Sequence, residues 1–299
     1  AICTAVFGNC AEFIIALSAL RLGLIDVVKA SITGAILSDL LLVTGIAMLV
    51  GGLKYSEQSF QETMVRTNGA AMTLAVMAMA LPASLISTSG IDDPIAIHGL
   101  SITVAVILIV IYFLTLIFSL ATHSHLFDPQ HIQTDEIESL QEAKETINLS
   151  PWIIQLIFCT ALLAYQSESF VHFLEPATEQ LGFSALFTGI IIIPIVGGFS
   201  EYVPAVKGAW KDQMDLPISL AMGSSLLVAL LIAPALIIIG SLIGQPMNLD
   251  FTAFEVIALI FSVLIVNLVN MDAKSNWLEG VLLLGMFSIF GAAFYYYPS

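Results

Sequence analysis

Residues 8–12 read Gly-Asn-Cys-Ala-Glu, and residues 197–201 read Gly-Gly-Phe-Ser-Glu. Each segment places one carboxylate, Glu12 or Glu201, inside a long apolar stretch. A shift of 189 positions superimposes the two segments, without a gap, over 27 positions. Identical pairs under this shift include Gly8 and Gly197, Ala16 and Ala205, Asp26 and Asp215, and Gly34 and Gly223. A charge at the centre of a bilayer costs about 2.5–3.5 kcal/mol even on the lenient insertion scale. Two such charges at matching positions indicate a shared use, as in a cation transporter.

The composition is that of a membrane protein. Hydrophobic residues make up 58% of the chain, the mean hydropathy is +0.98, and charged residues make up 10%, against about 25% in soluble domains. Apolar runs of about 20 residues predict transmembrane helices. We therefore expect an all-α membrane protein, an inverted-repeat helix bundle with nine spans at roughly residues 1–20, 29–51, 65–88, 99–121, 151–174, 184–206, 216–243, 252–271 and 277–296.

The cysteines and the net charge argue against several other classes. All three cysteines, Cys3, Cys10 and Cys159, fall inside predicted spans, so they indicate neither a disulfide framework nor a zinc site. The net charge of −15 is not that of a nucleic-acid-binding surface. The sequence has no nucleophile–base set and no phosphate-binding loop, so we expect neither an enzyme nor a cofactor. The expected surroundings are the lipid bilayer.

The basic residues predict the orientation in the membrane. One side of the membrane takes Arg21 and Lys29, and the other takes Lys54, Arg66, Lys144, Lys207, Lys211 and Lys274. This two-against-six split places the second group in the cytoplasm, so residue 1 begins there and the C-terminus faces outward. The apolar run is already under way at Ala1, which is not a start methionine. We therefore expect at least one N-terminal span to be missing.

The two glutamate segments form an inverted repeat. Glu12 lies on the first predicted span and Glu201 on the sixth, and this odd offset makes the two helices cross the membrane in opposite directions. Secondary transporters with this arrangement bind ions near the midplane. The expected organisation is a first inverted repeat at 1–121 that lacks its opening helix, an acidic cytosolic linker at 122–150, and a second inverted repeat at 151–299.

The residues around both glutamates suit an ion pocket. Five of them weaken helical continuity there: Gly8, Pro194, Gly197, Gly198 and Pro204. Irregular backbone at membrane depth is tolerated only where it lines a cavity. The partner segments carry Gly34-Ala35 and Gly223-Ser224-Ser225, small residues that permit close backbone approach. Carboxylate, amide and hydroxyl oxygens suit a hard cation such as Ca²⁺, and two facing carboxylates take up protons when the cation leaves. Alternate neutralisation by a cation or by protons is an exchange mechanism.

Eight stretches carry a resemblance to a known family: GNCAEFIIALSAL, VVKASITGAILSDLLLVTG, GGLKYSEQSF, THSHLFD, PIVGGFSEYVPAV, MGSSLLVALLIAP, IGQPMNLDFT and SNWLEGVLLL. Together they span nearly the whole chain, which resembles the calcium/proton exchanger (CAX) family of the calcium/cation antiporter superfamily. The resemblance implies an eleven-helix antiporter with two inverted five-helix repeats behind one extra N-terminal helix. It also implies export or sequestration of Ca²⁺ driven by a proton gradient, in the plasma membrane of a prokaryote. The family's motif glutamates map onto Glu12 and Glu201, and its first-motif asparagine maps onto Asn9.

The departures from the family pattern cluster in the expected pocket. Six positions differ from the residue that is usual in the family. This chain has Gly198 in place of asparagine, Tyr202 in place of histidine, Pro204 in place of threonine, Leu227 in place of glutamine, Ala35 in place of serine and Asp39 in place of asparagine. The pocket thus loses an amide, an imidazole and a carboxamide and gains a carboxylate. We hypothesise that Asp39 partly compensates for these losses. The candidate metal ligands are Glu12, Glu201, Asn9, Asp39 and Ser224.

Several alternatives stay open at this stage. The favoured function is Ca²⁺/H⁺ exchange; the alternatives are exchange of Mn²⁺ or Na⁺, and a non-transporting regulatory membrane protein with a degenerate second motif. Three candidate ligands also have a structural alternative: Asn9 caps or bridges helices, Asp39 lies in water near a helix end, and Ser224 serves only in packing. The acids and histidines of the linker 122–150 form either a solvated connector or a cation-sensing segment. Three residues predicted at the outer end of the fifth span are either solvated or line an ion vestibule: Glu168, His172 and Glu175.

Overall fold

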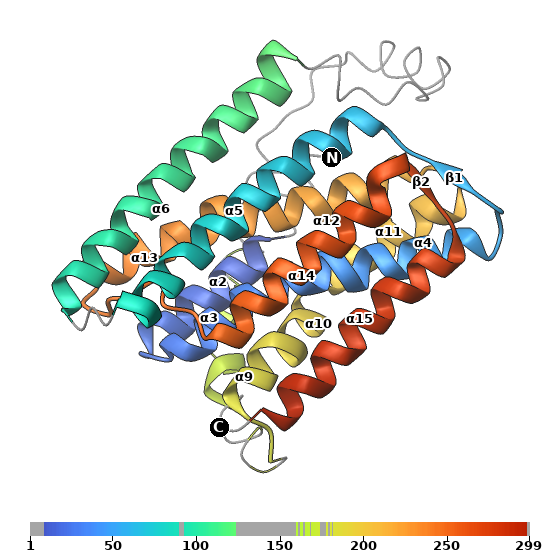
Figure 1. The fold of residues 1–299 in the computed structure, drawn as a ribbon. Helices are drawn as coiled ribbons and strands as arrows, with labels where there is room; N and C mark the ends of the chain where they lie inside the picture. The colour runs from blue at the N-terminus through green and yellow to red at the C-terminus, as the bar shows by residue number, and fades with distance from the viewer. Residues whose placement is uncertain are drawn as a thin grey trace, which may run out of the picture.

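The structure, a computed structural model, describes residues 9–89, 93–123 and 182–297, with scattered positions between 160 and 180 (Figure 1). The helices before the central linker are α2 (Cys10–Arg21), α3 (Ile25–Leu37), η1 (Ser38–Val43), α4 (Thr44–Gly52), α5 (Glu62–Ser89), α6 (Pro94–Ile117) and η2 (Phe118–Thr122). The helices after it are α9 (Ala185–Phe187), η4 (Thr188–Ile192), α10 (Ile193–Gly197), α11 (Phe199–Trp210), α12 (Asp215–Leu227), η5 (Val228–Ile232), α13 (Ala233–Leu242), α14 (Ala253–Val269), η6 (Asn270–Asp272) and α15 (Trp277–Tyr296).

The helices have the length and apolarity of membrane spans. Six helices of the described part qualify: Ile25–Gly52, Glu62–Ile86, Pro94–Thr122, Asp215–Leu242, Ala253–Asp272 and Trp277–Tyr296. A bent pair, Ala185–Gly197 and Phe199–Trp210, makes a seventh if it is one span. These segments coincide with seven of the nine predicted spans, and the predicted helical membrane fold is confirmed. The other two, at 1–20 and 151–174, lie partly or mostly outside the described residues, so the total of nine stays a prediction.

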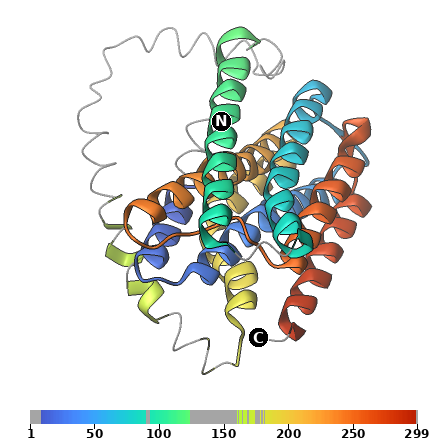
Figure 2. The same cartoon turned by 60° about the vertical axis from the view of Figure 1, so that its left-hand side comes forward.

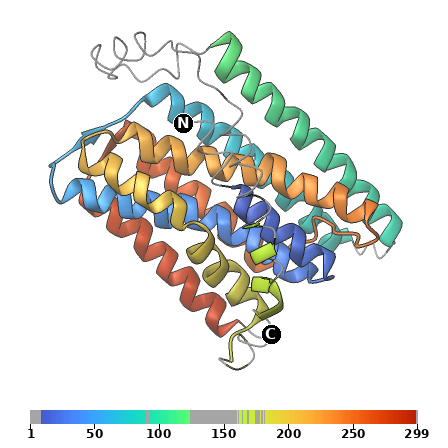
Figure 3. The same cartoon turned by 180° about the vertical axis from the view of Figure 1, so that it is seen from behind.

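Two long composite helices form the centre of the bundle. In the span α3–η1–α4, 83% of the most apolar window is buried, and in α12–η5–α13 the figure is 67%. The span α6–η2 has only 17% of its window buried, so it is peripheral. Figure 2 shows α6 in front of the other helices, and Figure 3 shows it along one edge. Both central helices contain a π-helical turn, η1 or η5, which the sequence pattern did not reveal.

The two repeats share local geometry at equivalent positions. Gly23 and Asp212 are separated by the same 189 positions, and both have left-handed backbone, with φ of 78° and 61°. Each lies in the short turn between a glutamate-bearing helix and its partner helix. Gly51 and Gly240 are also 189 positions apart, and a loop folds closely over each of them. The side chain of Gln58 lies against Gly51, and the carbonyl oxygen of Gln245 lies 2.5 Å from where a Cβ on Gly240 would stand.

Side-chain caps and one short strand pair fix the helix ends. Thr252 and Glu255 form a reciprocal capping box at the start of α14, and Asn276 and Glu279 form another at the start of α15. The strands β1 (Gln58–Ser59) and β2 (Lys274–Ser275) pair antiparallel and join the loop after α4 to the loop before α15. Segments more than 200 residues apart in the sequence are therefore held side by side at one end of the bundle.

Glycine permits the closest helix crossing near the glutamates. Helix α3 packs against η4, and a Cβ on Gly34 would lie 2.6 Å from the Cα of Ile190 and 2.6 Å from Cγ of Pro194. A Cβ on Gly189 would similarly collide with the Cβ of Ala30. The predicted close approach at Gly34 is confirmed. At Gly223 no atom of another described segment lies within 4 Å of an added Cβ. The positions equivalent to Ile190 and Pro194 are Ala1 and Ala5, which lie outside the described residues, so the close approach at Gly223 stays a prediction.

Candidate functional site

Both motif glutamates lie in the first turn of a helix. Glu12 is the third residue of α2, and Glu201 is the third residue of α11. Helix α11 follows a 58° bend from α10 at Gly198, which confirms that the second glutamate segment interrupts a span. Free N–H groups and the helix dipole at a helix N-terminus favour negative charge. The break therefore places each carboxylate where partial positive charge faces it. Pro204 lies inside α11 and does not coincide with the bend.

Three carboxylates lie near one another: those of Asp39 and Glu201, which are buried, and that of Glu12, which is half-buried. Glu12 interacts electrostatically with Glu201, and Asp39 interacts with both. Asp39 is 1% exposed and Glu201 is 3% exposed. Glu12 Oε2 and Glu201 Oε2 are buried and have no hydrogen-bond partner among the described residues. The alternative in which Asp39 is wet at a helix end is wrong, because its side chain is fully enclosed.

Polar side chains from the two repeats meet beside these carboxylates. Asn9 Nδ2 donates to Ser224 Oγ at 2.8 Å, and Ser224 Oγ lies 3.0 Å from Asn9 Oδ1. Ser225 Oγ donates to Asp39 Oδ2 at 3.4 Å. The structure thus brings Asn9 and Ser224 into direct contact, and it joins Asp39 to the same Gly-Ser-Ser segment. Ser225 was not among the candidate ligands predicted from the sequence. The two consecutive serines, Ser224 and Ser225, were the sequence feature that could have identified it.

The equivalent bridge on the other side of the site is missing. Asn9 corresponds to Gly198 under the 189-residue shift, and Ser224 corresponds to Ala35. Both partners of the symmetric hydrogen bond are therefore replaced by residues without polar side chains. Asp39 in turn corresponds to Val228. At these three pairs of positions one side of the site is polar or charged and the other is apolar, whereas the glutamates Glu12 and Glu201 are kept on both sides.

Tyr202 occupies the space that Gly198 leaves open. Tyr202 Oη lies 3.2 Å from Ser38 Oγ and donates to Pro194 O at 3.5 Å. A Cβ on Gly198 would lie 2.9 Å from Pro194 O and 3.4 Å from Tyr202 Oη. An added side chain at position 198 would therefore collide with the backbone at Pro194 and stand in contact with Tyr202. The two departures from the family pattern are neighbours in the structure.

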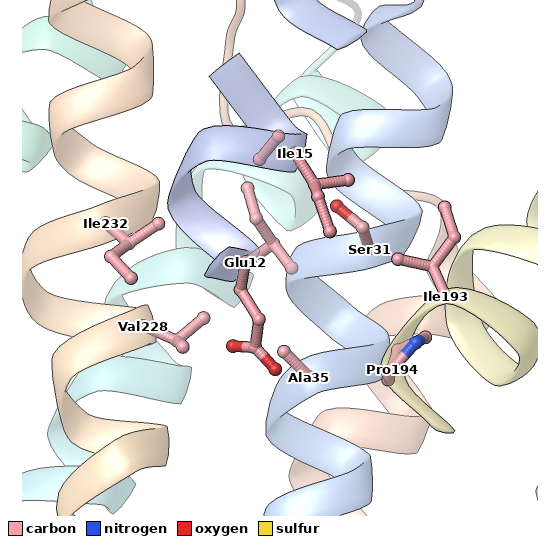
Figure 4. Close-up of a pocket in the computed structure, with 10 residues that line it drawn as sticks. Glu12, Ile15, Ser31, Ala35, Ile193, Pro194, Val228 and Ile232 are labelled. Atoms are coloured by element: carbon pink, nitrogen blue, oxygen red, sulfur yellow. The ribbon is translucent and has the colours of Figure 1, made fainter. Parts of the chain in front are cut away.

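A small cavity adjoins Glu12 (Figure 4). Its volume of about 20 Å³ is enough for about one water molecule. Figure 4 shows the Glu12 carboxylate between Val228 and Ala35, with Ile193 and Pro194 on the far side. Ser31 supplies the other polar side chain of the lining; the remaining residues are Ile15, Ala16, Ile32 and Ile232. Neither Glu201 nor Asp39 lines this cavity.

The described residues contain no group of three or more His, Cys, Asp or Glu side chains arranged to hold a metal ion. Glu12, Glu201 and Asp39 therefore approach one another without forming such a group in the described part of the chain. A cation with six to eight oxygen ligands would also draw on amide, hydroxyl and backbone oxygens and on water.

Some predicted features lie outside the described residues. Almost all of the acidic linker 122–150 is among them, and so are Glu168 and Glu175. His172 is described and exposed, and its ring stacks on that of Phe173 with centroids 5.6 Å apart. The cation-sensing linker and the ion vestibule stay predictions.

Comparisons with known proteins give a consistent result. The family model described as sodium/calcium exchanger protein matches residues 1–121 and 151–296. A Ca(2+)/H(+) antiporter of Aphanothece halophytica is 46% identical over 301 residues, which cover 98% of this chain and 81% of that protein. A Ca(2+)/H(+) antiporter of Synechocystis sp. is 46% identical over 305 residues, covering 99% of this chain and 82% of that protein. The solved structure of native YfkE superimposes with a TM-score of 0.82 at 34% identity, over 97% of this chain and 82% of YfkE.

Proposed function

The chain belongs to the sodium/calcium exchanger protein family, and on that premise we propose that it is a secondary antiporter exchanging Ca²⁺ for H⁺. The observation that carries this proposal is the meeting of Glu12, Glu201 and Asp39, three carboxylates from the two repeats that are buried or half-buried, in a multi-pass membrane protein. Its relatives from Aphanothece and Synechocystis are named as antiporters of these two ions. We place the protein in the plasma membrane of a prokaryote, as the relatives from these two organisms suggest.

The proposed cation site comprises Glu12, Glu201, Asn9, Asp39 and Ser224. Carboxylate, amide and hydroxyl oxygens are the ligands that Ca²⁺ prefers. The hydrogen bond between Asn9 and Ser224 holds two of these side chains in a fixed mutual orientation. The broken helix at Gly198 adds backbone carbonyls close to Glu201. The helix N-termini behind both glutamates support their negative charge while they bind the cation.

Proton coupling follows from the crowding of the carboxylates. Three negative charges cannot share a buried site without a cation, so protons take its place. Glu12, Glu201 and Asp39 are close enough to interact with one another, so a proton bound to one of them relieves the repulsion between them. Entry of Ca²⁺ would expel these protons, and their exit to one side drives the exchange.

The altered pocket supports two alternative functions. Exchange of Mn²⁺ or Na⁺ uses the same carboxylates, and the loss of polar groups at Gly198 and Leu227 with the gain of Asp39 favours a changed ion preference. A non-transporting regulatory protein is the remaining alternative. Its support is the apolar lining of the cavity on the side of Ala35 and Val228.

Ion flux tests these readings directly. The full-length protein is reconstituted into liposomes with an internal pH indicator, and a gradient of Ca²⁺, Mn²⁺ or Na⁺ is applied in turn. We expect Ca²⁺ to drive proton movement well above that of empty liposomes. Stronger proton movement with Mn²⁺ or Na⁺ would assign the other cation, and none with any ion would favour the regulatory role.

Substitution of Asp39 tests its part in the site. Asp39→Asn removes one charged ligand and one proton acceptor but keeps the shape of the side chain. We expect the apparent affinity for Ca²⁺ to fall about tenfold, because charge count sets the affinity of oxygen sites. The slope of log Kd against pH should become smaller in magnitude by about one unit, because one proton that competes with Ca²⁺ is lost. Both quantities are measured by Ca²⁺ titration of transport between pH 6 and 9.

Asp26→Asn is the matched control for Asp39→Asn. Asp26 is an exposed carboxylate on α3, in the same span as Asp39. Its substitution removes the same charge outside the site and should leave both affinity and pH slope unchanged. A silent Asp39→Asn variant would leave Glu12 and Glu201 as the charged ligands and refute the compensating role.

A further inference from the structure

A second cavity lies between α5 and α14, away from the glutamates. Its volume is about 230 Å³, and it shares no lining residue with the cavity beside Glu12. Figure 1 shows α5 and α14 side by side, and they are in direct contact. The lining residues come from one end of each helix: Val65, Arg66, Gly69, Ala70 and Thr73 from α5, and Asn267, Asn270 and Met271 from α14 and η6. The antiporter mechanism proposed above does not use this cavity.

One polar group in this cavity lacks a partner. Asn270 is 2% exposed, and neither its Nδ2 nor its Oδ1 has a hydrogen-bond partner among the described residues. A buried amide left without partners costs about 1–3 kcal/mol, so natural proteins satisfy such groups with water or a ligand. Both amide atoms are also shielded from water, so the side chain of Asn270 lies behind the cavity wall and must rotate to offer its donor and acceptor to a ligand in the cavity.

The neighbouring amide shows that the cavity wall is built for close polar contact. Asn267 Nδ2 donates to Thr73 Oγ1 at 3.1 Å and to Gly69 O at 3.5 Å. Asn267 Oδ1 lies so close to Gly69 that any larger residue there would collide with it. Two amides and a hydroxyl therefore line one side of the cavity at the junction of the two helices.

Arg66 supplies a positive charge at the cavity. Its side chain is 72% exposed, and one guanidinium nitrogen contacts Glu62 Oε1 at 2.5 Å. A guanidinium has five N–H donors in a planar fork, so the contact with Glu62 leaves donors for a second anion. Lys274, a cation close in sequence to η6, is held by Glu57 at 3.0 Å. Arg66 is thus the cation of this cavity that an anionic ligand would meet.

The position of this cavity in the membrane indicates which kind of anion binds there. Arg66 lies near the start of one span and Met271 near the end of another, so the cavity lies at the boundary between hydrocarbon and water. Exposed apolar side chains continue from it along both helices toward the bilayer centre: Leu74 and Met77 on α5, and Leu264 and Leu268 on α14. The basic residues predict that this boundary faces the cytoplasm, where anionic lipid headgroups attract arginine and lysine.

We propose that this cavity binds the phosphate group of an anionic phospholipid. Arg66 pairs with the phosphate, the side chain of Asn270 rotates toward the headgroup and completes its hydrogen bonds there, and the acyl chains lie along the apolar faces of α5 and α14. The bound lipid bridges two helices that come from different repeats. The proposal is independent of which cation the protein transports.

Lipid titration of the purified full-length protein in detergent tests the proposal. The rise in melting temperature is measured against the concentration of phosphatidylglycerol, phosphatidylcholine or inorganic phosphate. We expect phosphatidylglycerol to bind with at least about tenfold higher apparent affinity than phosphatidylcholine, because a charged donor favours the more anionic headgroup. An equal response to both lipids would overturn the proposal. An equal response to inorganic phosphate at matched concentration would overturn the lipid as the source.

Two variants locate the binding. Arg66→Gln should abolish the preference for phosphatidylglycerol; this side chain is exposed, so the variant should fold. Asn270→Ala should weaken binding about tenfold without removing the charge preference. Lys274→Gln is the matched control, because it removes an exposed cation at the same end of the bundle, and it should retain wild-type binding. Retained preference in Arg66→Gln, or its loss in Lys274→Gln, would place the lipid elsewhere.

Discussion

Glu12→Gln and Glu201→Gln should each reduce Ca²⁺-driven proton flux by more than about 100-fold. Even indirect partners of metal ligands cost about 10–100-fold when they are removed, and these two carboxylates are proposed as direct ligands. Glutamine keeps the length and shape of glutamate but neither binds an exchanging proton nor carries a charge. Each variant therefore loses a cation ligand and a proton carrier together. Proteoliposome flux measured at several pH values quantifies the loss.

Folding should survive both substitutions. Glu12 Oε2 and Glu201 Oε2 have no hydrogen-bond partner in the described part of the chain, so an amide breaks no bond at those atoms. Melting temperature and elution volume in detergent should stay close to those of the wild type.

Glu255→Gln is the matched control for the glutamate variants. Glu255 is 1% exposed on α14, and glutamine can keep its role in the capping box with Thr252. This variant removes a buried carboxylate outside the proposed site and should retain most of the flux. Undiminished flux in either Glu12→Gln or Glu201→Gln would refute a site shared by both glutamates.

Gly34→Ala should destabilise the protein and impair transport. The added methyl group would stand 2.6 Å from both Ile190 Cα and Pro194 Cγ, where helix α3 crosses η4 and α10. Overpacking of this kind costs about 1–3 kcal/mol, and here backbone atoms must move to relieve it. Ile193 and Pro194 line the cavity beside Glu12, so their displacement changes the site itself. We expect a lower melting temperature in detergent and a reduced rate of exchange.

Gly285→Ala is the control for the glycine substitution. Gly285 is exposed on α15, and among the described residues no atom outside its own helix lies within 4 Å of an added Cβ. The same chemical change there should therefore leave melting temperature and transport near wild type. Equal damage from both substitutions would show that the crossing at Gly34 is not the cause.

Much of the architecture could be predicted from the sequence, because its signals are local. Seven apolar runs became the expected spans, and the interruption before Glu201 appears as a bend at Gly198. Burial of the glutamates follows from the cost of placing a charge in an apolar helix. The π-helical turns η1 and η5 were not predicted, because no residue type marks a one-residue change in hydrogen-bond spacing.

The composition of the site could be predicted only in part. The repeat motif led directly to Glu12, Glu201 and Asn9, and family departures drew attention to Asp39. The hydroxyl of Tyr202 was not predicted to bond Ser38, because the two residues are 164 positions apart. The close approach predicted at Gly34 is confirmed, and the one predicted at Gly223 stays a prediction because the segment equivalent to residues 190–194 lies outside the described residues.

The sequence by itself determined that this is a helical membrane protein with a carboxylate at equivalent positions of two repeats. Hydropathy and repetition run along the chain, and a bilayer converts both into spans whatever the later packing. Only the tertiary structure decided that Asn9 bonds Ser224, 215 positions away, and that Ser225 bonds Asp39, 186 positions away. It also decided that Tyr202 lies beside Gly198 and within hydrogen-bonding distance of Ser38. Such contacts depend on how distant helices cross, and a crossing is set by the packing of both surfaces at once.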